Sequence, residues 1–558
     1  MASSFNQIFR GAAGTSADPT NVEDVFSTYL YEGNGATPTI TNGIDLAGEG
    51  GLVWIKNRDA TDNNVLTDTV RGATKISYSN GTHAEGTDAD TITSFTSTGF
   101  VLGADVKVNT SAESYAAWTF RKAPKFFDCV TFTGDGNEPS AWINHSLGQV
   151  PGLIIIKRTD SASSWFVHHR SLGRYDNILL NSTAGEVRQL IFDSTTNGMT
   201  STQFRIHFGG GNDANIDGAS YVAYLFAHDT GSDGLIQCGS YAYDGGGSVT
   251  LGWEPQFVLL KTSSAASNWT IHDSMRGMWA SERGPALYTD GNNAEASTSG
   301  FVYLNSTGFT VPADMFDPCT QIYMAIRNPM MATITDATEV FAIDGSVGAT
   351  AATGFPADMM LQKDIDNSGS YDDFALTDRL RNTMWLETSS TSAETNGSIF
   401  GGWDSNTTAG NGGSNASLWG EHAWAWKRAK GFFDVVAYTG TGSAKTEAHN
   451  LGVVPEMIWI KHRSGTDNWI VGHKAFNWLG PIYLNEAYQY VGDNIAWWNN
   501  TAPTSTEFTI GTGAASNTNT GTYIAFLFAT LAGVSKVGSV THSGTSTDVA
   551  CGFSAGAR

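Results

Sequence analysis

The sequence predicts an all-β protein made of tandem β-sandwich modules of about 100 residues each. Composition is the first reason. Glycine provides 63 of the 558 residues and charged residues only 15%, while Ser, Thr and Asn fill most polar positions. This balance is typical of short strands joined by small polar turns. The second reason is that three separate sequence markers recur with one period.

The first marker is a short apolar run that ends in lysine. The lysines are Lys56, Lys157, Lys261, Lys363 and Lys461, which are 101, 104, 102 and 98 residues apart. Each run is rich in β-branched or aromatic residues and follows glycine or proline, which predicts a strand. A polar loop and a second, aromatic strand come next, so we expect a β-hairpin in each module.

The second marker is a run such as Tyr221-Val222-Ala223-Tyr224, with a central alanine at 117, 223, 325, 423 and 525. Because such a run is apolar at every position, we expect a central strand that is buried on both faces. The third marker is a glycine, usually followed by proline three residues later. It occurs as Gly148, Gly252, Gly354, Gly452 and Gly552.

The markers divide the chain into an N-terminal arm and a series of modules. We place the arm at 1–25, the modules at 26–125, 126–230, 231–333, 334–431 and 432–533, and the start of an incomplete sixth module at 534–558. Modules 1 and 4 share an ending, with Phe126 and Phe432 306 residues apart. The larger unit is therefore predicted to be a triplet, present once whole and once in part. The final segment favours a longer or cleaved parent polypeptide, the alternative being first strands that complete a neighbouring module.

Charge and composition exclude several classes of protein. The formal net charge of −23 disfavours binding to nucleic acid or to anionic membrane surfaces. The first residues lack the apolar stretch of a signal peptide, and no window is long and apolar enough for a membrane helix, so we expect no membrane insertion. The four cysteines lie far apart, which argues against a zinc ribbon, a redox pair or a disulfide scaffold.

An acid and an arginine recur three residues apart after the hairpin. The pairs are Asp68/Arg71, Asp273/Arg276 and Asp378/Arg381, while His169 and His473 take the place of the acid in modules 2 and 5. One interpretation is a ligand-binding carboxylate with an arginine clamp. The other is a structural turn with an ion pair worth a few tenths of a kcal/mol. Repetition in modules with different neighbours favours the structural interpretation.

One segment resembles the beginning of a calcium loop. Asp364, Asp366, Ser368 and Asp372 supply oxygens at alternating positions, with Gly369 at the turn. Ala375 stands where a bidentate glutamate is needed, and the segment fills the hairpin-loop slot of the repeat. A polar turn is therefore the favoured interpretation, and we expect no metal and no cofactor.

Tryptophans beside Asn, Ser and Gly are the candidate binding residues. They are Trp403, Trp419, Trp478, Trp497 and Trp498. Exposed rings next to amides suit the faces and hydroxyls of sugars, whereas packing between modules is the structural alternative. The sequence contains no nucleophile elbow, dinucleotide-binding turn or phosphate loop, so we expect no enzymatic activity.

Several segments together resemble tandem-module virion proteins of marine bacteriophages, cyanophages among them, which are described as tail-fibre or structural proteins. The segments are Val53–Arg58, Arg121–Asp128, His145–Arg158 and Tyr221–Asp229. The resemblance extends from about residue 26 to the end and is clearest in modules 1, 2 and 5. It implies a place in the virion, release by lysis and other virion proteins as partners, and it supplies no catalytic residues.

The resemblance and the residues together favour a tail fibre or similar appendage that contacts the host cell surface, a glycan or a protein. The arm at 1–25 is then expected to dock to the particle. A homo-oligomer is expected, a trimer by analogy with fibres in general. Two alternatives remain: a capsid-decorating or tail-bracing protein without receptor contact, and a depolymerase of surface polysaccharide.

Overall fold

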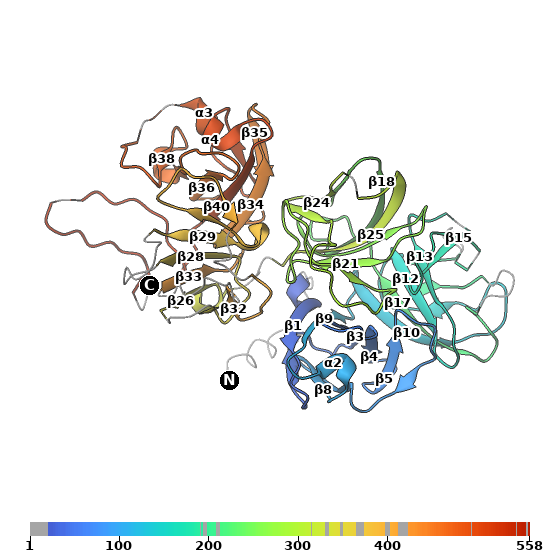
Figure 1. Cartoon of the computed structure of the whole chain (residues 1–558). Coiled ribbons are helices and arrows are strands. Elements are labelled where there is room, and N and C mark those ends of the chain that lie inside the picture. The colour runs from blue at the N-terminus through green and yellow to red at the C-terminus, as the bar shows by residue number, and fades with distance from the viewer. Residues whose placement is uncertain are drawn as a thin grey trace, which may run out of the picture.

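The chain folds into two lobes of antiparallel sheets, which confirms the all-β prediction (Figure 1). The computed structural model describes residues 20–173, 175–189, 191–192, 198–207, 213–313, 315–329, 334–345, 350–363, 373–396, 402–410, 422–490, 492, 494–542, 544–553 and 556–557. Modules 1, 2 and 3 form the first lobe, drawn blue to green, and modules 4 and 5 form the second, drawn yellow to red. None of the helices in these residues has the length and apolar character that crossing a membrane requires.

Every module contains one large and one small sheet. In module 1 the large sheet has the order β1 (Phe26–Glu32), β9 (Ser114–Arg121), β3 (Gly51–Asn57), β4 (Val65–Asp68), β5 (Lys75–Tyr78) and β6 (Gly86–Thr87). Its small sheet is β2 (Thr39–Thr41), β8 (Gly99–Leu102) and β7 (Ile92–Thr96). The first strand of the module thus pairs with its last, and the lysine-ended strand lies on the other side of that last strand.

The other two modules of the first lobe repeat this order. Module 2 has β10 (Phe127–Thr133), β17 (Ser220–Phe226), β12 (Leu153–Arg158), β13 (Trp165–His169), β14 (Asp176–Leu179) and β15 (Val187–Arg188), with β11 (Ile143–Asn144) and β16 (Gln203–Phe204) as the small sheet. Module 3 has β18 (Ile236–Tyr243), β25 (Cys319–Arg327), β20 (Pro255–Thr262), β21 (Thr270–Asp273) and β22 (Leu287–Tyr288), with β19 (Gly247–Thr250), β24 (Gly308–Val311) and β23 (Tyr303–Asn305) as the small sheet.

The second lobe repeats the order twice. Module 4 has β26 (Phe341–Asp344), β33 (His422–Trp426), β28 (Met359–Lys363), β29 (Ala375–Asp378), β30 (Met384–Glu387) and β31 (Thr395–Asn396), with β27 (Ala351–Ala352) and β32 (Thr408–Ala409). Module 5 has β34 (Phe433–Thr439), β40 (Thr522–Phe528), β36 (Met457–His462), β37 (Ile470–His473) and β38 (Ile482–Tyr483), with β35 (Lys445–Ala448) and β39 (Glu507–Ile510).

Helices are short and lie between the strands. The α-helices are α2 (Val106–Asn109), α3 (Ile495–Trp498) and α4 (Ala514–Asn517), and the 3₁₀ turns are η1 (Val22–Asp24), η2 (Ala337–Glu339), η3 (Arg379–Arg381) and η5 (Lys474–Phe476).

The predicted hairpin and central strand are confirmed. In each module the lysine-ended strand pairs with the strand that follows it, and also with the last strand of the module. The interiors of β9, β17 and β40 are buried at every position, as are the residues of β25 from Gln321 to Ile326. Only β33 alternates between buried and partly exposed residues.

The strand pairing corrects the position of the second marker in module 3. Lys56 lies opposite Ala116 and Lys261 lies opposite Ile322, so Tyr323 is the counterpart of Ala117 in module 3. The alanine predicted for this position, Ala325, is two residues away. Because side chains alternate along a strand with a period of two, the shift keeps the same face toward the core.

The three modules of the first lobe share one hydrophobic core. It contains Leu52, Leu153 and Phe257 from the three lysine-ended strands, together with Phe120, Phe226 and Ile326 from the three central strands. The ring of Phe120 lies 5.4 Å from that of Phe226 and 6.1 Å from that of Phe257. Aromatic contacts at these distances stabilise beyond the area that they bury. The modules therefore meet around a common aromatic centre.

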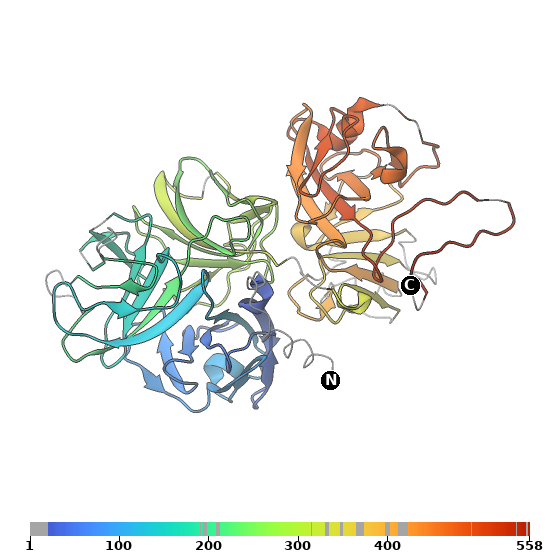
Figure 2. The same cartoon turned by 180° about the vertical axis from the view of Figure 1, so that it is seen from behind.

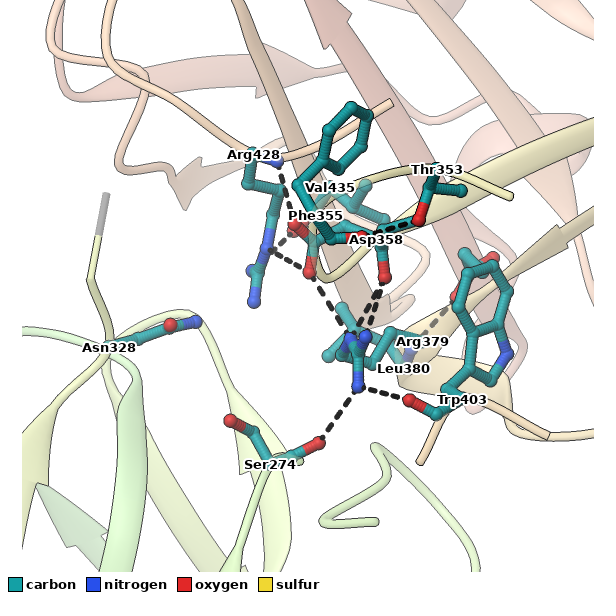
Figure 3. Close-up of polar contacts among 12 residues, drawn as sticks. Ser274, Asn328, Thr353, Phe355, Asp358, Arg379, Leu380, Trp403, Arg428 and Val435 are labelled. Atoms are coloured by element: carbon teal, nitrogen blue, oxygen red, sulfur yellow. Dashed lines mark hydrogen bonds and ion pairs between the residues drawn. The ribbon is translucent and has the colours of Figure 1, made fainter. Parts of the chain in front are cut away.

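A buried ion pair joins the two lobes. Arg428 of module 4 donates to both carboxylate oxygens of Glu254 in module 3, at 2.6 and 3.0 Å, and both side chains are buried. Beside it, Arg379 donates to the carbonyl oxygens of Trp403 and, across the junction, Ser274 (Figure 3). Further contacts join the lobes seen from behind in Figure 2: the Ala280 amide donates to the Leu380 carbonyl, Arg463 donates to Ser281, and buried apolar residues of modules 3, 4 and 5 form one hydrophobic cluster.

We expect the Arg428→Met variant to loosen the junction between the lobes, because it leaves the Glu254 carboxylate buried without its cationic partner. Small-angle scattering checks this as a larger maximum dimension with unchanged melting of each lobe. Adding Glu254→Met removes the stranded charge and is expected to restore compactness. An unchanged scattering curve for Arg428→Met contradicts the role of the pair.

Candidate functional site: the seams between modules

The loop tryptophans do not form an exposed surface. Trp403, Trp478 and Trp498 are 5%, 4% and 1% exposed, so the prediction that these rings are displayed on loops is wrong. Trp497 is partly buried, and Trp419 lies outside the described residues. Trp478 and Trp498 pack edge to face at 5.3 Å inside module 5. These tryptophans fill module cores.

Local backbone geometry explains why these rings turn inward. Asn477 and Trp478 have φ of 52° and 59°, and Asn499 and Asn500 have φ of 49° and 48°. Left-handed residues reverse the chain, and asparagine adopts this conformation readily. Gly472 leaves the space that both rings occupy, since a Cβ there would lie 2.5 Å from Trp478 and 2.6 Å from Trp498. The asparagines beside the tryptophans thus serve the turn.

The calcium candidate falls on residues that the structure does not describe. Asp364, Asp366, Ser368 and Asp372 lie outside the described residues. Within the part of the chain that the structure describes, no three His, Cys, Asp or Glu side chains are grouped so as to hold a metal ion.

The recurring acid–arginine pairs are formed, and they are buried. Arg71 donates to Asp68 at 2.6 Å and Arg276 donates to Asp273 at 2.6 Å, with side chains at most 4% exposed. The structural interpretation of these pairs is confirmed. Their burial, however, removes the solvent screening that makes exposed pairs weak.

In the first lobe, each acid position also contacts another module. The Tyr224 hydroxyl of module 2 donates to Asp68 of module 1 at 2.8 Å, and the Trp118 indole of module 1 donates to Asp273 of module 3 at 3.0 Å. In module 2 the position is His169, whose Nε2 lies 3.0 Å from the carbonyl oxygen of Tyr323 in module 3. We call these contact surfaces between modules seams. The seams 1–2, 2–3 and 3–1 close the first lobe into a ring.

In modules 1, 2, 3 and 5, the residue eight positions after the module lysine donates a hydrogen bond to the neighbouring module across the seam. The Trp165 indole donates to the Tyr78 carbonyl at 2.9 Å, and that of Trp269 to the Leu179 carbonyl at 2.9 Å. In module 1 this residue is Asn64, whose amide donates to the Tyr288 carbonyl at 3.1 Å. In the second lobe, Trp469 of module 5 donates to the Glu387 carbonyl of module 4 at 2.8 Å, which defines seam 4–5.

Three of the recurring lysines, Lys157, Lys261 and Lys461, also bond across the seams, whereas Lys56 donates to carbonyls of its own module. The Lys157 ammonium donates to the carbonyl of Ser163 in its own loop at 2.6 Å and to that of Thr82 in module 1 at 3.1 Å. The Lys461 ammonium likewise donates to the backbone carbonyl of Asp467 in its own loop at 2.7 Å and to that of Thr391 in module 4 at 2.9 Å. Burial lowers the pKa of both lysines to about 8. A buried ammonium held by carbonyl oxygens fixes loops in place.

A fourth repeated residue was missed by sequence reasoning. The backbone amides of Glu85, Glu186, Glu295 and Glu394 each donate to the carbonyl two residues beyond the lysine of the adjoining module, at 2.7–2.9 Å. The side chain of Glu295 also bridges Arg276 and, across seam 3–1, Arg58. The signal was present, because these glutamates are 101, 109 and 99 residues apart.

Several pockets open on the surface of the described residues. The pocket of about 390 Å³ in module 2 contains His168, His228 and Arg170. Burial lowers the pKa of His168 to about 3, so its imidazole is neutral near pH 7. Cys129 and Cys238 are buried, and their thiol pKa values are raised by burial, which disfavours the reactive thiolate. These groups serve packing.

Acid is expected to destabilise the protein, because four buried histidines are held neutral. Burial lowers the pKa of His168 and His272 to about 3 and of His169 and His449 to about 4. Protonation therefore favours the unfolded chain, where the histidine pKa is about 6.5. The stability that these neutral histidines contribute is complete above pH 6.5 and is lost as the pH falls toward 4.

Urea denaturation at pH 7.5, 6, 5 and 4.5 measures how steeply the free energy of unfolding falls with decreasing pH. Asp290 and Asp434, whose pKa values are raised to about 6 by burial, oppose it. The His272→Gln variant should make the free energy of unfolding depend less steeply on pH, since up to one proton fewer is taken up on unfolding. Stability that stays constant or rises between pH 6.5 and 4.5 contradicts the expectation.

Comparison with known proteins places the chain in a family. No curated protein matches it. A family model described as "Domain of unknown function (DUF7483)" matches residues 21–329 and residues 336–555. The first match covers the three modules of the first lobe, and the second covers modules 4 and 5 and the segment after them. The boundary agrees with the predicted triplet, and the chain belongs to the DUF7483 family, with two tandem matches.

Proposed function

We propose that this protein is a structural component of a bacteriophage particle, a tail fibre or similar appendage. The observation that carries the proposal is the repeated seam, in which buried side chains bond from one module to the next, as Lys157 does at seam 1–2, Trp118 at seam 3–1 and Trp469 at seam 4–5. Buried, fully paired contacts of this kind make a lobe stiff. A stiff series of modules with no catalytic arrangement among the described residues suits a mechanical role.

The resemblance to virion proteins of marine bacteriophages is the reason for proposing that this structural role is in a phage particle. The proposal includes self-association as a trimer, attachment to other virion proteins, and contact of an exposed module with a host surface glycan or protein. Several copies on one particle make weak individual contacts sufficient through avidity.

Immunogold electron microscopy tests the proposal on particles purified from a lysate that contains the protein. Antibody raised against the full chain is expected to label fibres or the tail. Label on other fractions only, with none on particles, contradicts a virion role. Sedimentation of the purified chain is expected to give the mass of a trimer.

A brace or decoration protein without receptor contact is the second candidate. It is favoured by the burial of Trp403, Trp478 and Trp498, because these rings are then unavailable to sugars. Gold label over the capsid or along the tail shaft, away from any fibre, supports this candidate over the first.

A further inference from the structure

The second lobe has the architecture of the first with one position of the ring open. Module 4 matches module 1 and module 5 matches module 2 at the positions that face a third module. Trp424 takes the place of Trp118, as its pairing with Leu361 corresponds to that of Trp118 with Trp54. His473 takes the place of His169, opposite Met457 as His169 is opposite Leu153.

Side chains that are buried in the first lobe are exposed at this open position. Leu180 of module 2 is 0% exposed, and its carbonyl accepts a hydrogen bond from Thr289 of module 3, whose own carbonyl accepts one from Ser79 of module 1. Its counterpart Leu484, likewise 23 residues after the module lysine, is 38% exposed. Trp118 is fully buried, whereas Trp424 is partly exposed.

The same contrast holds at the aromatic centre. Phe120, Phe226 and Ile326 are at most 1% exposed. Their counterparts Trp426 and Phe528 are partly exposed. The second lobe thus presents an apolar, aromatic face in the place where module 3 covers modules 1 and 2.

Residues 535–553 repeat the beginning of module 3. Gly538, Val549 and Gly552 follow Gly239, Val249 and Gly252 at distances of 299 or 300 residues. The turn glycines share a left-handed conformation, with φ of 83° at Gly252 and 78° at Gly552. The bridge from Leu531 to Ser535 also repeats the one from Ala429 to Phe433 that leads from module 4 into module 5.

Among the described residues, this segment does not form the strand pairs that its counterpart in module 3 forms. In module 3, β18 pairs with β25 and β19 with β24, and Val249 is 6% exposed. Val540 and Val549 are 57% and 58% exposed, and no strand is assigned to the described residues after β40. Figure 2 shows the segment as a dark red loop that projects from the lobe.

We propose that the second lobe binds, as its third module, a polypeptide that carries the counterpart of residues 254–329, with residues 535–553 as the first strands of this composite module. Two separate surfaces require the same occupant. The projecting segment needs a last strand to pair with, and the open ring position needs the lysine-ended strand and hairpin of a module. Adding a missing strand to an unpaired one supplies main-chain hydrogen bonds, and side-chain pockets set the specificity.

An extended chain tests the proposal. Residues 1–553 are followed directly by a second copy of residues 254–329, and hydrogen exchange is compared with that of the unmodified chain. Exchange is expected to slow about a hundredfold or more in residues 536–541 and to slow also in β33 and residues 482–486. Slowing in both regions supports the proposal, and unchanged exchange in either region overturns it.

The Leu484→Asp variant provides the matched control. In the unmodified chain it should leave exchange unchanged, because Leu484 is exposed there, whereas in the extended chain it should reverse the slowing in β33. Titrating the unmodified chain with a separate polypeptide of residues 254–329 is a second test, which does not depend on the extended chain folding. Sedimentation is expected to show a 1:1 complex, and the absence of any complex at tens of micromolar counts against the proposal.

Discussion

The Arg276→Met variant is expected to lose about 3–5 kcal/mol of the free energy of unfolding of the first lobe. Arg276 is fully buried and pairs with Asp273 at 2.6 Å and with Glu295 at 2.8 Å. Its guanidinium also lies 5.3 Å from the Trp118 ring of module 1. Removing it leaves two carboxylates in seam 3–1 without their shared cation.

Arg158→Met is the matched control, because Arg158 pairs with Asp160 at a similar distance, 2.7 Å, on the surface. Exposed pairs contribute about 0–1 kcal/mol, so this variant should unfold almost like the unmodified chain. Urea denaturation of both variants at pH 7.5 makes the comparison. Equal losses for the two arginines contradict the assignment of Arg276 to a buried seam.

The Trp118→Ala variant is expected to lose about 3–5 kcal/mol as well, because a large buried ring leaves a cavity that its neighbours fill poorly. Its indole also donates to Asp273 across seam 3–1, and that carboxylate loses a hydrogen bond. Both effects weaken the closure of the ring.

Trp424→Ala removes the same side chain at the counterpart position of module 4. This ring is partly exposed and has no third module against it among the described residues, so a loss of about 1–2 kcal/mol is expected. Calorimetry resolves the two lobes if their melting temperatures differ. A loss for Trp424→Ala as large as that for Trp118→Ala contradicts the open position in the second lobe.

The sequence predicted the features that depend on local pattern. The lysine-ended strand, the hairpin after it and the doubly buried central strand follow from apolar runs, turn residues and their period. The triplet followed from comparing modules with one another. These are features that one module, or a pair of aligned modules, contains within itself.

Features set by contacts between modules were beyond local pattern. The spacing of Asp273 and Arg276 indicated an ion pair, but only the approach of Trp118, 155 residues away in sequence, buries the carboxylate. Loop tryptophans beside asparagine looked exposed, since the sequence does not reveal that left-handed Asn477 and Asn499 turn the rings inward. The glutamate marker was obscured by unequal loop lengths before Glu295.

Hydrogen exchange of the unmodified chain tests the central claim most directly, namely that the first lobe is a closed ring and the second an open one. Amides in β9, β17 and β25 are expected to exchange slowest and together, because the three modules of the first lobe bury these strands around one core. Amides in β33 are expected to exchange faster. Exchange in β33 as slow as in β9, or separate exchange of β9, β17 and β25, contradicts the account.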